Sequence, residues 1–213
     1  YSALVCAGAL DFADAVRIVR QRGTFMQEAV PVGTGAMAAI LGLDTETLDK
    51  VCRAAAQDQV VSPANFNSAG QVVIAGHAEA VDRAMELAKE NGAKRALPLP
   101  VSAPFHCSLM VKAGERLAAV LAGVEVGDMT VPVVTNVEAA PNRDSSRVCQ
   151  LLVDQVSAPV LWDETIACMI KLGVERYIEI GPGKVLAGLV KRVARNSLVQ
   201  NVQNVDDINL LTP

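Results

Sequence analysis

Apolar runs and amphipathic segments alternate in a fixed order between residues 33 and 98, and this order restricts the fold more than any other feature of the chain. A period of two residues indicates a strand, and a period of about 3.6 residues indicates a helix. The predicted elements are strands at 36–41, 60–66, 71–75 and 95–97 and helices at 44–56 and 79–89. The NSAG sequence between the two middle strands supplies the glycine and short polar side chains of a hairpin turn. This βαββαβ order predicts a small ferredoxin-like subdomain over residues 33–98.

The segments on either side of this subdomain follow another order. A helix is predicted at 11–29. Beyond residue 98, helices are predicted at 108–121, 144–156, 163–172 and 184–195, with strands at 131–136 and 176–180. Alternation of helix and strand predicts a parallel sheet covered on both faces. We therefore expect an α/β protein in which residues 33–98 are inserted into a core formed by 1–32 and 99–213.

The composition restricts the possible functions. Of the 213 residues, 51% are hydrophobic and 20% are charged, which is enough for a well-packed core. Aromatic residues make up only 3% and the net charge is -4, so the sequence argues against a nucleic-acid partner. It contains neither a run of 18 apolar residues nor a basic secretion signal, and we expect a cytoplasmic protein without a membrane span.

Arg22 is a cation on an otherwise apolar helix stripe. The apolar members of this stripe in the first predicted helix, separated by steps of three and four, are Phe12, Ala15, Val19 and Met26. A stripe of this kind faces a core. A guanidinium in such surroundings costs several kcal/mol unless it is paired. The pattern therefore predicts that either a protein carboxylate or an anionic ligand binds Arg22.

The chain has only two histidines. His77, in AGHAEAV, stands at a turn that enters a helix, which favours a surface or capping role. His106, in LPLPVSAPFHCSLM, lies in a loop that leads from a strand to the start of a helix, where α/β proteins place catalytic groups. A loop histidine held by hydrogen bonds is the alternative. A dyad with Cys107 is not expected, because adjacent residues at a helix start point in different directions.

Several apparent motifs fail on spacing. IGPGKV at 180–185 lacks two residues of a phosphate-binding loop, since Ile178 and Val185 replace a glycine and a hydroxyl residue, and we expect a tight strand-to-helix turn. GTGA at 33–36 lacks the third glycine of a dinucleotide site. No GxSxG nucleophile motif occurs. The odd number of cysteines without a CxxC pair favours buried reduced thiols over disulfides or a metal site: Cys6, Cys52, Cys107, Cys149 and Cys168.

Four segments carry a resemblance to a known family. They are QRGTFMQEAVPVGTGAMAAILGL, VSPANFNSAGQVVIAG, AKRALPLPVSAPFHCSLM and IEIGPGKVLAGLVKR. In this order and at these distances they closely resemble the malonyl-CoA:acyl-carrier-protein transacylases of bacterial fatty-acid synthesis, from Tyr1 to about Arg195. The acyltransferase domains of polyketide synthases are the nearest related group. The resemblance implies an α/β-hydrolase-like core over 1–32 and 99–213 with a ferredoxin-like insertion over 33–98.

The resemblance also implies a reaction. The family transfers malonyl from CoA to the phosphopantetheine thiol of acyl carrier protein through a seryl-acyl intermediate, and CoA is a substrate, not a cofactor. The family serine belongs to a GHSxGE motif just before the segment that begins here as YSALVCAG. That segment resembles the inside of a helix already under way. We therefore expect the nucleophile, the oxyanion-hole donors and the N-terminal part of the core to precede Tyr1.

Three residues match functional positions of the family, and two of their neighbours are expected to contact the acyl group. His106 matches the general base, and the backbone carbonyl of Gln155 would orient it. Arg22 matches the arginine that binds the free carboxylate of malonyl in a two-pronged contact. Met26 and Phe105 are expected to form walls of the acyl pocket, with plain core packing as the alternative.

Acyl carrier protein is acidic, so an enzyme of net negative charge needs a local basic face to bind it. The basic residues expected to bind it are Lys184, Lys191, Arg192 and Arg195 of the last long helix and the pair Lys94 and Arg95. We expect this pair to lie near the His106 loop, and the apolar side of the last helix to turn inward through Leu186, Leu189 and Val193. A merely solvated charged face is the alternative.

Two other classes of function stay open. One is a fragment or scaffold without activity, since the nucleophile is expected outside this sequence. The other is a hydrolase of the same fold, which would release malonate to water and would not need a carrier protein. For the transacylase we expect a monomer that needs no metal and no cofactor.

Overall fold

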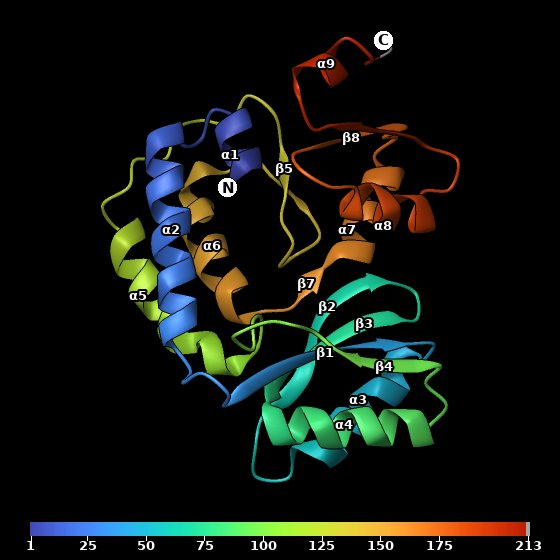
Figure 1. Ribbon diagram of the computed structural model, residues 1–213. Helices are drawn as coiled ribbons and strands as arrows, with labels where there is room; N and C mark the ends of the chain where they lie inside the picture. Colours follow the sequence, from blue (N-terminus) through green and yellow to red (C-terminus); the bar gives the residue numbers. More distant parts are fainter. Residues whose placement is uncertain (212–213) are drawn as a thin grey trace.

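The computed structural model describes residues 1–211 and belongs to the mixed α/β class, as predicted (Figure 1). Its helices are α1 (Ser2–Cys6), α2 (Phe12–Glu28), α3 (Thr45–Ala56), α4 (Ala78–Glu90), α5 (Val111–Leu121), α6 (Val148–Ser157), α7 (Trp162–Lys171), α8 (Val185–Val193) and α9 (Val205–Ile208), with short 3-10 turns at Ser108–Met110 and Ser145–Arg147. Its strands are β1 (Gly35–Leu41), β2 (Val61–Ser68), β3 (Gln71–His77), β4 (Arg95–Pro98), β5 (Val133–Val134), β6 (Pro141–Asn142), β7 (Val160–Leu161), β8 (Arg176–Ile180) and β9 (Leu198–Val202).

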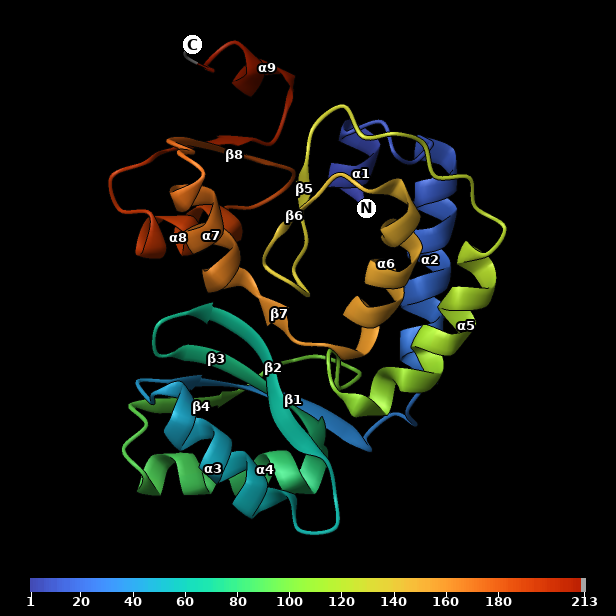
Figure 2. The ribbon, with the colours of Figure 1, turned by 180° about the vertical axis from the view of Figure 1, so that it is seen from behind.

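The largest sheet has the strand order β4-β1-β3-β2-β7. Its first four strands pair antiparallel, and β7 pairs parallel to β2. On this sheet Ile40 lies opposite both Val72 and Ala96, so these three side chains share one face. Helices α3 and α4 cover that face, and the far side of the molecule is seen in Figure 2.

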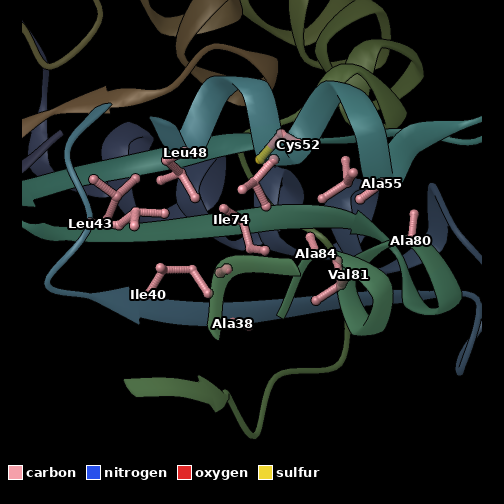
Figure 3. Packing of buried hydrophobic residues seen from close by; sticks show 14 residues of the cluster. Ala38, Ile40, Leu43, Leu48, Cys52, Ala55, Ile74, Ala80, Val81 and Ala84 are labelled. Carbon is pink, nitrogen blue, oxygen red and sulfur yellow. The ribbon is translucent and has the colours of Figure 1, made fainter. Parts of the chain in front are cut away.

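The core between this sheet and its two helices is apolar throughout (Figure 3). Ile40, Leu48 and Ile74 are at most 1% exposed and pack between the strands and the helices. Helix α3 begins after Asp44, whose carboxylate accepts hydrogen bonds from the backbone N–H and the hydroxyl of Thr47. An acidic N-cap of this kind stabilises a helix by satisfying a free backbone donor.

A second layer is formed by α2, α5 and α6, which pack against one another away from the sheet (Figures 1 and 2). The buried side of α2 differs from the predicted stripe. Ala15, Ile18 and Met26 are buried, but Phe12 and Val19 are 71% and 45% exposed. Both sets fit the helical period, and the direction from which α5 approaches selects Ile18 over Val19.

The parallel sheet predicted for the second part of the chain is confirmed only in part. Within residues 1–211, parallel pairing joins only β2 with β7 and β8 with β9. The predicted strand at 131–136 is reduced to β5, which pairs antiparallel with β6. The cause is a tight turn, in which Thr135 and the residues near Ala139 exchange backbone hydrogen bonds and reverse the chain.

The last part of the chain packs α7 and α8 on the β8–β9 pair. The predicted tight turn after β8 is confirmed, with Gly181 and Gly183 at positive φ angles that favour glycine. The predicted inward side of α8 is confirmed only in part, because Leu189 and Val193 are half-buried and Val193 packs on the buried cluster of this region. Leu186 is 42% exposed, and the buried residues of this region are Ala187, Val190 and Ala194. No helix within residues 1–211 is long and apolar enough to cross a membrane.

Candidate active site

A cavity of about 310 Å³ lies where α2, α6, the β5–β6 hairpin and the loop after β4 meet. Its lining residues are Tyr1, Ala3, Leu4, Arg22, His106, Val133, Val134, Thr135, Asn136, Asn142, Val148, Leu151, Leu152, Gln155 and Val160. The cavity therefore brings together Arg22 and His106, the two residues that the sequence singled out separately.

The loop that carries His106 is attached to the sheet at two points. The backbone N–H of Leu99 donates to the carbonyl of Met37 at 2.9 Å. Pro104 packs so tightly on Gly35 that a Cβ atom added to this glycine would lie 2.4 Å from the proline ring. His106 itself has a φ of +59°, an unfavourable angle for a residue with a side chain. Strain of this kind persists only where the surrounding contacts hold it.

The ring of His106 is oriented by a main-chain atom. Its Nδ1 lies 2.9 Å from the backbone oxygen of Gln155, in the last turn of α6. A carbonyl oxygen only accepts hydrogen bonds, so Nδ1 carries the proton and Nε2 is left as the basic nitrogen. Burial lowers the pKa of His106, the bond to Gln155 raises it, and the charge of Arg22 lowers it further. The net pKa is below the usual value, so the ring is a neutral base at physiological pH.

Arg22 reaches the same cavity from α2. It is half-buried, and burial lowers its pKa. Within residues 1–211 its side chain forms no ion pair, whereas Arg17 on the same helix pairs with Asp14 at 2.8 Å. Of the two partners predicted from the sequence, the protein carboxylate is therefore not found. The site can accept an anion beside a neutral histidine.

Met26 and Phe105 are not among the residues that line the cavity. Both belong to an apolar cluster of α2, α5 and α6, in which Met26 is 3% exposed and Phe105 is half-buried. Core packing accounts for Met26 in this structure. A contact of either residue with an acyl group stays a prediction.

His77 and Cys107 have structural contacts. The Nδ1 atom of His77 accepts a hydrogen bond from the backbone N–H of Val60 at 2.9 Å, which ties β3 to the start of β2. The thiol of Cys107 is buried and donates to the carbonyl of Pro104, and burial raises its pKa to about 11. Such a thiol is not a nucleophile at neutral pH. Cys6, which was expected to be buried, is exposed.

Lys94 and Arg95 do not adjoin the His106 loop, contrary to expectation. Arg95 lies opposite Leu41 at one end of β1, and the loop packs on Gly35 at the other end. These two ends are roughly 20 Å apart at the usual rise of a strand. The antiparallel pairing of β4 with β1 decides this placement, and pairing direction is not visible in a single segment.

The pair Lys94 and Arg95 instead lies at the same corner of the sheet as Lys191 and Arg192 of α8. Arg192 of α8 donates a hydrogen bond to the side chain of Gln71. Gln71 lies opposite Leu41, which lies opposite Arg95, so the residue that binds Arg192 is two strand spacings away from Arg95. Lys94 and Lys191 adjoin them and are exposed. We call Lys94, Arg95, Lys191 and Arg192 the basic corner.

Among the cavity residues that the sequence analysis missed, two have buried hydroxyl groups. Tyr1 and Thr135 line the cavity, and their hydroxyl groups are buried without a hydrogen-bond partner among the described residues. For Thr135 a signal existed, because polar residues directly after an apolar strand often line a site. Tyr1 carries no such signal.

The whole described chain matches one protein family. The acyl transferase domain family matches residues 1–212. The chain belongs to this family. The predicted resemblance is also confirmed, because the malonyl CoA-acyl carrier protein transacylase of Escherichia coli (strain K12) is 58% identical over 193 residues, which are 91% of this chain and 62% of that protein. The chain thus spans less than two thirds of the length of this relative.

Solved structures of acyl transferases have the same fold. An acyl carrier protein S-malonyltransferase from Vibrio cholerae O1 biovar eltor is 50% identical, with a TM-score of 0.97 over 100% of this chain and 69% of that one. A malonyl-transacylase in complex with a type II PKS acyl-carrier protein is 51% identical, with a TM-score of 0.94 over 98% of this chain and 68% of that one.

Proposed function

We propose that this protein transfers a malonyl group from CoA to the phosphopantetheine thiol of acyl carrier protein and so supplies the extender unit for fatty-acid synthesis. The observation that carries the proposal is the cavity in which Arg22, free of any carboxylate partner among the described residues, lies beside the neutral base His106. The names of the relatives support it. We propose that the nucleophile is the serine of a GHSxGE motif, as the resemblance to the transacylases implies.

His106 moves one proton in each half-reaction. Its Nε2 takes the proton of the serine hydroxyl as the serine oxygen attacks the malonyl thioester, the C–S bond breaks, and the imidazolium returns the proton to the thiolate of CoA. The pantetheine thiol then gives its proton to Nε2 and attacks the seryl ester, and the serine oxygen leaves and is reprotonated. Gln155 holds Nδ1–H throughout. General-base assistance of this kind contributes about 10²- to 10⁴-fold in rate.

Arg22 selects the acyl group. Its guanidinium presents two parallel N–H donors to the free carboxylate of malonyl, which compensate the cost of its burial. An acetyl group leaves the charge unpaired. A hydrogen bond to a charged group is worth about 1.5–3 kcal/mol, so malonyl is preferred by roughly one to two orders of magnitude.

Replacing Arg22 tests the proposal. In a protein that carries the GHSxGE segment ahead of Tyr1, we expect Arg22→Ala to lower kcat/KM for malonyl-CoA by about 10- to 100-fold, while acetyl transfer is maintained or rises. Acyl-enzyme formation is measured by intact mass and carrier-protein loading by radiolabel. Arg20→Ala, two positions away on the exposed side of the same helix, is the matched control. Equal loss with both acyl donors contradicts the proposal.

The basic corner is proposed as the binding surface for acyl carrier protein. Its four cations lie together on an otherwise acidic protein, and they can pair with an acidic helical partner. The relative solved in complex with an acyl-carrier protein supports a partner of this type. A solvated charged face is the alternative, and charge reversal distinguishes the two.

The domain organisation is part of the same proposal. We propose an α/β-hydrolase-like core over 1–32 and 99–213 with a ferredoxin-like insertion over 33–98. The strand order β4-β1-β3-β2 and the position of α3 and α4 on one face of these strands support the insertion. Expression of residues 33–98 alone tests it: a cooperative unfolding transition is expected, and an unfolded peptide argues against an independent subdomain.

The remaining properties follow from the reaction. The acyl donor is already an activated thioester and the acceptor is a thiol, so the proposed reaction needs neither a metal nor a cofactor, and we propose that the enzyme acts as a monomer in the cytoplasm. Activity after dialysis against a chelator and light scattering of the full protein test these points. The polyketide alternative is supported by the type II PKS complex of one relative, and loading rates for carrier proteins of the two pathways distinguish them. Release of free malonate without carrier protein indicates the hydrolase.

A further inference from the structure

One polar contact joins the helix of Arg22 to the loop of His106. Gln27 of α2 donates from Nε2 to the backbone oxygen of Ser102 at 3.5 Å, and the hydroxyl of Ser102 donates to Oε1 of Gln27 at 2.5 Å. Within residues 1–211 no other hydrogen bond connects α2 with the segment between β4 and the turn at Ser108. The pair therefore fixes a distance that no other polar contact fixes.

The contact stands close to both functional side chains along the chain. Gln27 follows Arg22 by five positions on the same helix, and Ser102 precedes His106 by four positions in the same loop. The other restraints on the loop lead elsewhere, because Leu99 is bonded to β1 and the His106 ring is bonded to α6. Within the described residues 1–211, this hydrogen-bonded pair and the apolar cluster around Met26 connect the loop with α2.

The location has a consequence for selectivity. Malonyl has a carboxylate at one end and the reacting carbonyl at the other, so its transfer requires Arg22 and His106 to be held at a fixed separation. Acetyl uses only the histidine end and is insensitive to this separation. A displacement of about 1 Å at a reacting centre costs up to roughly 10²-fold in rate.

We propose that Gln27 and Ser102 are positioning residues that set the separation between Arg22 and His106 and thereby the preference for malonyl. This inference rests on the proposed function. The strained φ of His106 agrees with it, because a loop held in an unfavourable conformation depends on its lateral contacts. Neither residue touches the substrate in this role.

The test compares two acyl donors in a protein that carries the GHSxGE segment. Gln27→Ala removes both hydrogen bonds, and we expect the ratio of kcat/KM for malonyl-CoA to that for acetyl-CoA to fall about 3- to 10-fold, the factor that corresponds to a net neutral hydrogen bond. Ser102→Ala removes one bond and lowers the ratio less. Ser102→Thr keeps the hydroxyl and restores the ratio. The double alanine variant falls no further than Gln27→Ala, because both changes remove the same contact.

Glu28→Gln is the matched control. Glu28 is the next residue of α2, and its ion pair with Arg116 at 2.8 Å ties the helix to α5 instead of to the loop. This variant is expected to keep the malonyl-to-acetyl ratio. Parallel loss of both activities in Gln27→Ala, or an equal change of the ratio in Glu28→Gln, overturns the inference. If the unsubstituted protein loads no malonyl at all, the proposed function fails instead, so the two failures are distinguishable.

Discussion

The two histidines of the chain lie in regions that differ in polarity. His77 belongs to the sheet covered by α3 and α4, where the interior is apolar and the ring is satisfied by the backbone of Val60. His106 lies in a cavity together with Arg22, whose charge is half-buried without a carboxylate partner among residues 1–211. Packing alone accounts for the structure of the region around His77. The second region contains polar groups that no other group of the described residues pairs with.

The difference has an energetic meaning. A buried polar group without a partner costs about 1–3 kcal/mol of stability, and a buried charge costs more. Thr135 and Arg22 therefore weaken the fold where they stand. Residues of this kind are kept for chemistry at the expense of stability. Substitutions in the two regions should consequently separate activity from stability.

The largest expected effect separates the two histidines. His106→Ala removes the general base and should lower malonyl transfer by about 10²- to 10⁴-fold, with little change in the free energy of unfolding. His77→Ala removes an acceptor for a backbone N–H and should lower stability by about 1 kcal/mol while activity is kept. Steady-state kinetics and urea unfolding of both variants are compared. A stability loss in the first variant that equals its activity loss would remove the distinction between the regions.

A core substitution examines the apolar region alone. Ile74 is fully buried between β3 and the two helices. Ile74→Ala should lower the free energy of unfolding by about 2–5 kcal/mol, since it removes apolar contacts and leaves a cavity. Below the unfolding transition, the malonyl-to-acetyl ratio should stay unchanged. A shifted ratio would mean that the sheet region contributes to selectivity.

Charge reversal at the basic corner has a smaller effect. Lys191→Glu together with Arg192→Glu should raise KM for acyl carrier protein about 10-fold and weaken its salt dependence, while malonyl loading from CoA is unchanged. Lys112→Glu on the exposed face of α5 is the control for net charge. An unchanged KM for acyl carrier protein would mean that the basic corner is only a solvated charged face.

The smallest expected effect is a change in pH dependence. The charge of Arg22 lowers the pKa of His106, and the base must be neutral to accept a proton. Activity is therefore lost as the pH falls through this pKa. Arg22→Ala should raise the pKa, so the acid limb of kcat/KM for acetyl transfer should move to higher pH. An unmoved limb would mean that the two residues are not coupled.

Much of the fold could be predicted because its elements have strong periodicity. The element order from β1 to β4 follows from residue patterns alone. Which side of α2 is buried could not be predicted, since the stripes through Ile18 and Val19 both fit a helix. The same ambiguity affected α8. The short β5 strand depends on a turn that the apolar pattern does not reveal.

The site was predictable where a residue conflicts with its surroundings. Arg22 interrupts an apolar stripe, and His106 stands in a loop after a strand. The partner of His106 is a backbone atom, which carries no residue signal and was found only through the family resemblance. The position of Arg95 depends on the direction of strand pairing, which a local pattern does not contain.

The carbonyl of Gln155 can accept a hydrogen bond from His106 because of the residue four positions later in the chain. In a continuing helix it would bond the N–H of residue 159, but this residue is a proline and has none. The oxygen also lies at the negative end of α6, which favours the imidazolium formed during turnover. Because the acceptor belongs to the main chain, substitution of the side chain at position 155 keeps the Nδ1–H tautomer of His106. Evolutionary constraint should fall on the proline that keeps competing donors away.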